Sequence, residues 1–348
     1  MPENRSKIGI TCAYAPIQII HAAGFTPYRI LPATDSKDQA GQILHDNICP
    51  HVKMILDRVL GSDIPELSGT LFINSCDSMR RLAGAYRKTK PEAKNITVDL
   101  PSSVTQTSVT YLADQYKKIA KVLEEWGSHE ITEKRLLDSI QIYNELKNLT
   151  QKLQLFFNEN KIKDANRKMQ GVYNLTLTHD PEIVIEAIKE LLTIDEGETS
   201  NSVPVFLFGN VLPDEELFNL FDDCGAQIVD DDLCTGSRYI SEIKLTGSDI
   251  FSDIAESTLL SPPCARTFDP NNPGAMAKNI FDRAGSVNAK GVVGYTLKFC
   301  DPYLARIPEI RSVLKREKIP FLQLEGDGRS GTIGQQLTRI EAFMEMLR

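Results

Sequence analysis

The residues best able to do chemistry in this sequence of 348 amino acids are its seven cysteines. An odd count in a long chain argues against a disulfide framework. No two of them form a CxxC pair, so the close spacing of zinc fingers and of ferredoxin-type motifs is missing. Any metal centre must therefore be assembled from distant parts of the fold. The seven are Cys12, Cys49, Cys76, Cys224, Cys234, Cys264 and Cys300.

Three of the cysteines follow runs that we expect to form β-strands. Ligands of open parallel sheets gather outside the carboxyl ends of the strands. A helix that begins there also offers free N–H groups and the positive end of its dipole, which favour thiolate over thiol. These positions therefore suit metal ligands. They are Cys12 after KIGIT (7–11), Cys76 after TLFINS (70–75) and Cys300 at the end of GVVGYTLKF (291–299).

The other cysteines vary in their surroundings. Cys49 precedes Pro50, the expected start of the helix PHVKMILDRVL, and Cys234 follows the run AQIV within DDDLCTGSRY. Cys224, at the end of an expected helix in FDDCGAQ, favours a structural role. A lone cysteine is usually a small buried hydrophobic residue. The presence of several cysteines at strand ends or helix starts favours a role as ligands instead.

The histidines and the known loop motifs narrow the chemistry further. The five histidines show no HExxH spacing, and thiolates without nearby histidines suit iron–sulfur clusters better than hydrolytic zinc. The sequence has no Walker A motif, no GxGxxG after a strand and no GxSxG elbow. Arg238, in CTGSRY, could contact a cluster or an acyl ester, but a surface ion pair is at least as well supported.

Elements that could position these residues alternate along the chain. Strand-like runs followed by helical periods indicate parallel βαβ units, and about 106–192 is mostly helical, with a fresh helix start at Thr132. The polar run DEGETSNS (195–202) is the best linker candidate. We therefore predict an α/β fold with two open parallel-sheet domains of Rossmann or flavodoxin type. The predicted parts are an N-terminal domain (1–105), a helical segment packed on it (106–195) and a C-terminal domain (196–348).

The composition excludes some partners. A net charge of −8 argues against a general nucleic-acid binder. The contents of 41% hydrophobic and 25% charged residues are those of an ordinary globular protein. The most apolar run, VPVFLFGNVL (203–212), is about half the length that spans a bilayer. The N-terminus shows no long apolar run. We expect a cytoplasmic protein that binds neither membrane nor nucleic acid.

Several stretches together resemble the 2-hydroxyacyl-CoA dehydratase / benzoyl-CoA reductase family, specifically the smaller subunit of the dehydratase component. They cover nearly the whole chain in the family's order, and they are specific as a set. The matching stretches include CAYAPIQIIHAAGFTPYRI (12–30), NSCDSMRRL (74–82), VDLPSSVTQTSVTYLADQYKKIAKVLEEWG (98–127), DDLCTGSRY (231–239) and VVGYTLKFCDPYLARIPEI (292–310).

The resemblance implies a cofactor and a reaction. It implies a 4Fe–4S cluster held by Cys49, Cys76 and Cys300 between α/β domains. The family eliminates water from a 2-hydroxyacyl-CoA through a ketyl radical, after an ATP-hydrolysing iron–sulfur activator injects one electron. The implied partners are this activator, the acyl-CoA substrate and a homologous second subunit, or a second copy in a homodimer. No acid or base residue can be assigned from the sequence.

The resemblance also leaves alternatives. Some relatives reduce the ring of benzoyl-CoA. Others carry a double-cubane 8Fe–9S cluster on six cysteines of one chain, for which Cys12, Cys234 and Cys264 would supply a second trio. A third alternative is an electron-relay subunit without a substrate site of its own. We rank the single cluster first and the double cubane lower.

Overall fold

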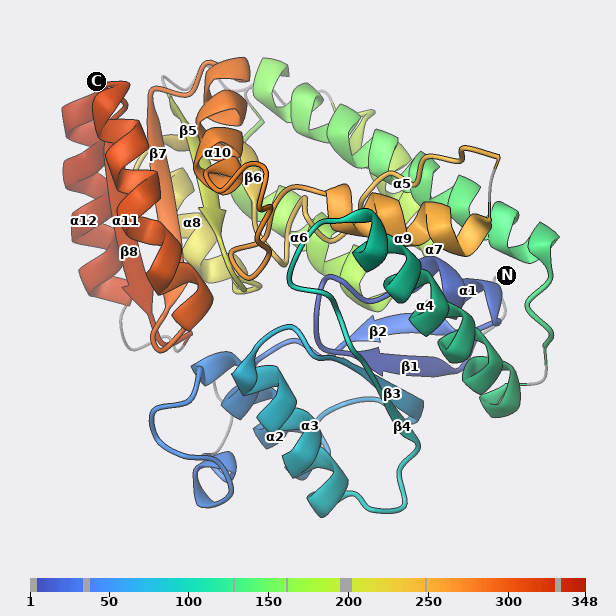
Figure 1. Cartoon of the computed structure of the whole chain (residues 1–348). Helices are drawn as coiled ribbons and strands as arrows, with labels where there is room; N and C mark the ends of the chain where they lie inside the picture. Colours follow the sequence, from blue (N-terminus) through green and yellow to red (C-terminus); the bar gives the residue numbers. More distant parts are fainter. Residues whose placement is uncertain are drawn as a thin grey trace.

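The structure is a computed structural model that describes residues 5–33, 38–127, 129–160, 162–194, 202–247, 249–328 and 333–348. In this part of the chain eight strands form two four-stranded sheets, and every neighbouring pair of strands is parallel (Figure 1). The predicted α/β fold with two open parallel sheets is confirmed. The strands are β1 (Lys7–Ile10), β2 (Thr26–Arg29), β3 (Leu67–Ile73), β4 (Asn95–Val98), β5 (Val203–Gly209), β6 (Ala226–Asp232), β7 (Gly291–Leu297) and β8 (Phe321–Gly326).

The two sheets share one topology. The first has the order β2-β1-β3-β4 and the second the order β6-β5-β7-β8, so each places its own second strand outside its first. The strand order therefore reverses between β1 and β3 in one sheet, and between β5 and β7 in the other. Ligands of such sheets bind outside the carboxyl ends of the strands at this reversal. Two equivalent binding positions follow from the topology.

Helices surround both sheets (Figure 1). Pro residues begin α2 and α7 and lie in the first turn of α11, where a missing N–H costs nothing. Thr132 accepts a hydrogen bond from the Arg135 N–H at 3.3 Å, as expected for a helix that starts at Glu133. The described helices are α1 (Ile17–Ala22), the 3₁₀ turn η1 (Ala40–Gln42), α2 (Pro50–Leu60), α3 (Asp77–Thr89), α4 (Gln106–Trp126), α5 (Glu133–Asn160), α6 (Ala165–Thr178), α7 (Pro181–Leu191), α8 (Glu215–Asp223), α9 (Ile250–Leu260), α10 (Ala275–Ser286), α11 (Asp301–Arg316) and α12 (Ile333–Leu347).

The first sheet is buried on both faces. One face, with Ile10 and Leu71, packs into a large apolar core with α1 and α4 to α7. The other face, with Phe72, packs against α2 and α3. Helix α9 lies far along the chain from α4 yet packs against it in the same core (Figure 1). The helical middle of the chain is therefore built onto the N-terminal sheet.

The second sheet follows the same plan. Alternate residues of β5 point to opposite faces, as the two-residue period of a strand requires. Val205 and Leu207 pack with α8 and α12, whereas Phe206 and Phe208 pack with α10 and α11. Phe208 also stacks on Phe321 of β8, with ring centroids 5.9 Å apart. Because both faces are covered, the strands present only their ends to ligands.

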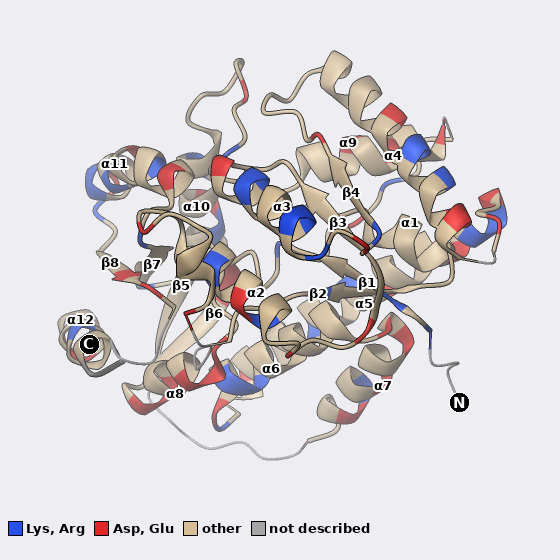
Figure 2. Cartoon of the chain, turned by 90° about the horizontal axis from the view of Figure 1, so that it is seen from below, with Lys and Arg blue, Asp and Glu red and all other residues tan. Residues whose placement is uncertain are grey.

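Residues 195–201 of the predicted linker lie outside the described residues. The boundaries 1–105, 106–195 and 196–348 stay a prediction, because packing alone does not reveal which segments fold independently. Basic and acidic residues are interspersed along the helices, and α3 carries several Arg and Lys residues (Figure 2). Among the described residues, no helix is both long and apolar enough to cross a membrane.

Candidate cysteine site

Three of the predicted ligands occupy the same position in their elements. Each is the residue that immediately precedes a helix, so the first N–H groups of that helix face the sulfur. Backbone N–H groups of His51 and Val52 hydrogen-bond to Cys49, and Tyr303 does so to Cys300. These N–H groups stabilise negative charge on the sulfur. The three residues and their helices are Cys49 before α2, Cys76 before α3 and Cys300 before α11.

The same three sulfurs lie within electrostatic reach of one another. Burial raises the pKa of Cys49 to about 12, and repulsion from Cys300 and Cys76 contributes to that rise. Burial likewise raises the pKa of Cys76 to about 11, with Cys12 and Cys300 adding to the effect. Thiolates crowded into a buried place need a cationic partner. The structure thus brings together the trio Cys49, Cys76 and Cys300.

The second trio adjoins the first. Burial raises the pKa of Cys264 to about 12, the nearby Arg238 charge lowers it, and Cys234 and Cys12 raise it. Cys12 also acts on Cys76, and Cys234 acts on Cys300. All six cysteines are therefore linked by pairwise electrostatic contacts. Cys224, at the end of α8, interacts instead with Glu341, Asp223 and Arg348, so it lies apart from the six.

The types of ligand available bear on the kind of metal group that this site could hold. Within the described residues, no three His, Cys, Asp or Glu side chains lie close enough together to ligate a single ion. The cysteines would supply soft thiolate ligands, which suit iron–sulfur chemistry. The donor set therefore fits a cluster better than a mononuclear site.

Arg238 contacts this site from the loop after β6. Its guanidinium donates to Cys234 Sγ at 3.3 Å and to the Tyr303 hydroxyl at 2.8 Å, and it pairs with Asp232 at 2.7 Å. Arg238 is only 3% exposed. Arg238 does form an ion pair, but the prediction that this pair lies at the surface is wrong. The pair is buried because Asp232 is the last residue of β6, a strand that other elements cover. In the sequence, the position of Asp232 at the end of a strand was the feature that could have indicated a buried ion pair.

Asn210 is a site residue that no sequence motif singled out. It follows β5 directly, at the point where the strand order of the second sheet reverses. Its side chain hydrogen-bonds to Cys300 and accepts from the Leu297 N–H at 3.3 Å, and its carbonyl accepts from the Cys234 N–H at 2.8 Å. The sequence feature that could have indicated Asn210 as a site residue is its position directly after the strand VPVFLFG.

Several buried polar groups beside the cysteines lack partners. Arg29 is 1% exposed, and its Nε has no hydrogen-bond partner. It donates to the Cys234 carbonyl, but no carboxylate of the described residues lies within ion-pair distance. Both ring nitrogens of His51 and Oγ1 of Thr11 are also unsatisfied, although the Thr11 backbone lies next to the ring. An unpaired buried cation fits a centre that carries net negative charge.

The backbone just before Cys300 is held in an uncommon conformation. Phe299 has φ of +58°, the left-handed region that bulky residues rarely adopt. Its side chain is 43% exposed, so packing of the ring does not explain the conformation. Such strain is found where a neighbouring side chain must be aimed. Here it lies in the turn from β7 into α11, directly before Cys300.

Comparison with known proteins places the chain in a family. A family model described as 2-hydroxyglutaryl-CoA dehydratase, D-component, matches residues 12–347. The (R)-phenyllactyl-CoA dehydratase beta subunit of Clostridium sporogenes is 24% identical, over 99% of this chain and 92% of its own length. The (R)-2-hydroxyglutaryl-CoA dehydratase subunit beta of Acidaminococcus fermentans is 22% identical, over 99% and 93%. A benzoyl-CoA reductase subunit of Thauera aromatica is 23% identical, over 94% and 87%.

Proposed function

The chain belongs to the 2-hydroxyglutaryl-CoA dehydratase D-component family, and on that premise we propose that it is the iron–sulfur subunit of a 2-hydroxyacyl-CoA dehydratase. The observation that carries the proposal is the convergence of Cys49, Cys76 and Cys300, each preceding a helix, beside an unpaired buried arginine. Relatives named as dehydratase beta subunits support the reaction class. The proposed reaction removes water from a 2-hydroxyacyl-CoA by way of a ketyl radical.

The proposed ligands of the 4Fe–4S cluster are Cys49, Cys76 and Cys300. When bound, such a cluster supplies one-electron transfer and an electrophilic iron. The chain contributes the environment. N–H groups of α2, α3 and α11 stabilise the thiolates, and Asn210 hydrogen-bonds to Cys300. Tyr303, which is buried, helps to exclude water from the cysteine crevice, the space that the proposed cluster would occupy.

The proposal includes partners. The relatives carry names of single subunits within larger enzymes, so we propose a homologous second subunit for this chain, or a second copy of it. We also propose that an ATP-hydrolysing iron–sulfur activator delivers the electron. The substrate class is an acyl-CoA that bears a 2-hydroxyl group.

A second candidate is favoured by one observation, which is the electrostatic linkage of all six cysteines. Six thiolates in one chain suit a double-cubane cluster, with Cys12, Cys234 and Cys264 as the second trio. Such a protein would be a reductase instead of a hydro-lyase. The benzoyl-CoA reductase relative shows that the family is not limited to dehydratases.

Iron and sulfide analysis of anaerobically purified protein separates these candidates. About four irons per chain support the dehydratase, and about eight support the double cubane. Cys300→Ser should lose iron in both cases. Cys264→Ser should lose iron only if the second trio ligates it. Cys224→Ser is the matched control and should keep all iron, since that thiol lies apart from the six. A folded protein that binds no iron would contradict both candidates.

A further inference from the structure

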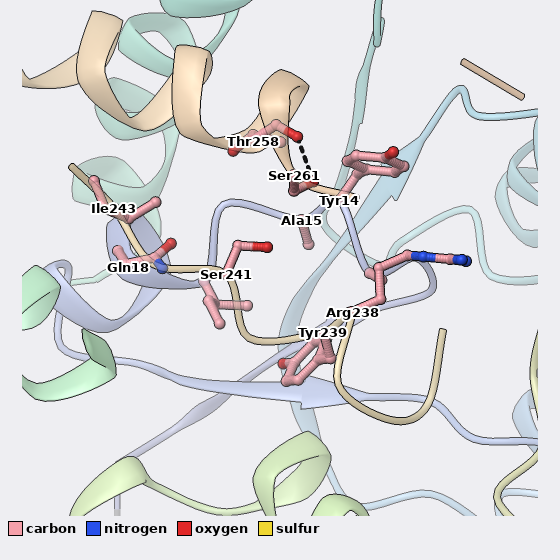
Figure 3. A pocket seen from close by; sticks show the side chains of 11 residues that line it. Tyr14, Ala15, Gln18, Arg238, Tyr239, Ser241, Ile243, Thr258 and Ser261 are labelled. Atoms are coloured by element: carbon pink, nitrogen blue, oxygen red, sulfur yellow. Dashed lines mark hydrogen bonds between the residues drawn. The ribbon is translucent and has the colours of Figure 1, made fainter. Parts of the chain in front are cut away.

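A small cavity lies next to Arg238, which contacts the cysteine site, and Figure 3 shows the side chains that line it. The loop after β1, helix α1, the chain around Tyr239 and the end of α9 form its walls. Its volume of about 30 Å³ is enough for one or two water molecules. A cavity holds water when two to four polar groups face it. The side chains that matter are Ala15, Gln18, Arg238, Ser241 and Ser261.

The side-chain amide of Gln18 faces the cavity without a hydrogen-bond partner from the described residues. It is 4% exposed, lines the cavity, and forms no side-chain hydrogen bond with the described part of the chain. An amide that the chain does not pair needs water as its partner, because leaving it without hydrogen bonds is costly. Ser261 donates to the Thr258 carbonyl at 2.7 Å, which leaves its oxygen free to accept, and Ser241 adds a second hydroxyl (Figure 3). These three groups can satisfy one water molecule.

The cavity lies between a large cleft and the cysteines. Ser241 and Ser261 line both the cavity and a cleft of about 890 Å³ that α5, α9 and α10 border. On the inner side, Arg238 lines the cavity and also donates to Cys234 Sγ at 3.3 Å. Tyr14, another lining residue, is within electrostatic reach of Cys264 and Cys12. The cavity thus borders the cleft on one side and the residues around the cysteines on the other.

We propose that the Gln18 cavity is an ordered-water site through which water and protons pass between the cleft and the cysteine crevice. The inference rests on the proposed function, because a buried dehydration must release the substrate hydroxyl and one proton as water. A reductase at the same centre would need protons to enter. Gln18 serves both directions, since its amide both donates and accepts.

The first test is a crystal structure of the purified chain, compared with its Gln18→Leu variant. Because Leu has nearly the same volume as Gln, the Gln18→Leu variant should fold. Water density is expected within hydrogen-bond distance of the Gln18 amide, and its loss is expected in the variant. Absence of this density in the unsubstituted protein would overturn the inference, whether or not iron is bound. Density without bound iron would count against the proposed function alone.

The second test uses D₂O as the probe. The reduced, cluster-loaded protein is transferred to D₂O, and deuterons near the cluster are measured by pulsed electron paramagnetic resonance. Ala15→Leu fills the cavity and should abolish or slow the gain of deuterium coupling. The control Ser286→Leu adds the same bulk to the outer wall of the cleft and should leave the coupling unchanged. Equal coupling in Ala15→Leu and the unsubstituted protein would overturn the relay role.

Discussion

Arg29 carries a positive charge into an interior that offers it no carboxylate among the described residues. Taking an ion out of water costs several kcal/mol, and one hydrogen bond to a carbonyl and a contact over the Tyr239 ring at 5.8 Å offset only part of that. The charge therefore destabilises the protein when no anionic group lies beside it. The positive charge of Arg29 stabilises the protein when an anionic group lies nearby.

Arg29→Met should separate these two states. Met keeps much of the side-chain length but removes the charge, so the free energy of unfolding of the cluster-free protein should rise by about 1–4 kcal/mol. With the cluster bound, the reduction potential should become more negative, because a nearby cation favours the reduced form. Urea unfolding and a redox titration measure the two effects. Arg58→Met, which breaks a partly exposed pair with Asp63, is the control and should leave the potential unchanged. A variant that is less stable without the cluster would contradict the account of Arg29.

Phe299 supports a second prediction at the residue scale. A left-handed conformation costs a bulky residue roughly 1–2 kcal/mol, and glycine avoids that cost. Phe299→Gly should therefore stay within about 1 kcal/mol of the unsubstituted protein. Phe299→Val should lose stability by roughly 1–2 kcal/mol and release iron more readily, because β-branching makes this conformation worse. Urea unfolding and iron retention test this, and equal behaviour of the two variants would count against it.

At the scale of elements, the close approach of β5 to β7 determines where Asn210 and Arg238 lie. A Cβ atom on Gly209 would come within 2.1 Å of the Tyr295 carbonyl oxygen in β7. The Gly209 carbonyl also accepts from the Tyr303 hydroxyl. Glycine is needed at this position because the contact is with backbone, which cannot rotate away.

Gly209→Ala should cost about 1–3 kcal/mol of stability and reduce iron content, since the strand end must shift. Gly84→Ala is the matched control. Gly84 lies exposed within α3 with no atom within 4 Å of an added Cβ, so it should gain about 1 kcal/mol from better helix propensity. Thermal unfolding of the two variants would show shifts of opposite sign. Shifts of the same sign would refute this explanation.

The sequence alone predicted most strands, because runs such as VPVFLFG and GVVGYTL are continuously apolar, as strands buried on both faces must be. It did not predict β2, which is short and contains Pro27 at the edge of the sheet. The helix-start positions of the cysteines could also be inferred locally. The burial of Arg238 and the pairing of Asn210 with Cys300 could not, because both depend on contacts between segments distant in the chain.

At the scale of the whole molecule, an ion-pair network joins the N-terminal strand region to α7. Arg5 pairs with Glu182 at 3.0 Å and with Asp180 at 3.3 Å, and His21 of α1 lies 3.5 Å from Glu182. Burial alone would raise the pKa of Glu182, but hydrogen bonds from His21 and Arg5 outweigh it and hold the pKa at about 2.

This lowered pKa predicts how stability depends on pH. The ordinary value is 4.5, so the unfolded carboxyl takes up a proton first as the pH falls. The stabilisation by Glu182 is therefore complete above about pH 4.5 and is lost between there and about pH 2. Glu182→Gln should destabilise the protein more at pH 6 than at pH 3, as measured by urea unfolding. Glu186→Gln, on the exposed side of α7, should show a smaller difference between the two pH values. An equal loss for Glu182→Gln at both pH values would contradict the assignment.

The division of the proposed ligands between the two sheets has a consequence for biosynthesis. Cys49 and Cys76 belong to the first sheet's surroundings, whereas Cys300 follows β7 near the end of the chain. During translation the first sheet can begin to form as it emerges, although its core is complete only after α9 has been made. Its two cysteines must then wait, unmetallated, until the second sheet has been made. The proposed cluster would thus be inserted only after Cys300 has been made, and a chain that ends before Cys300 would carry two of the three proposed ligands.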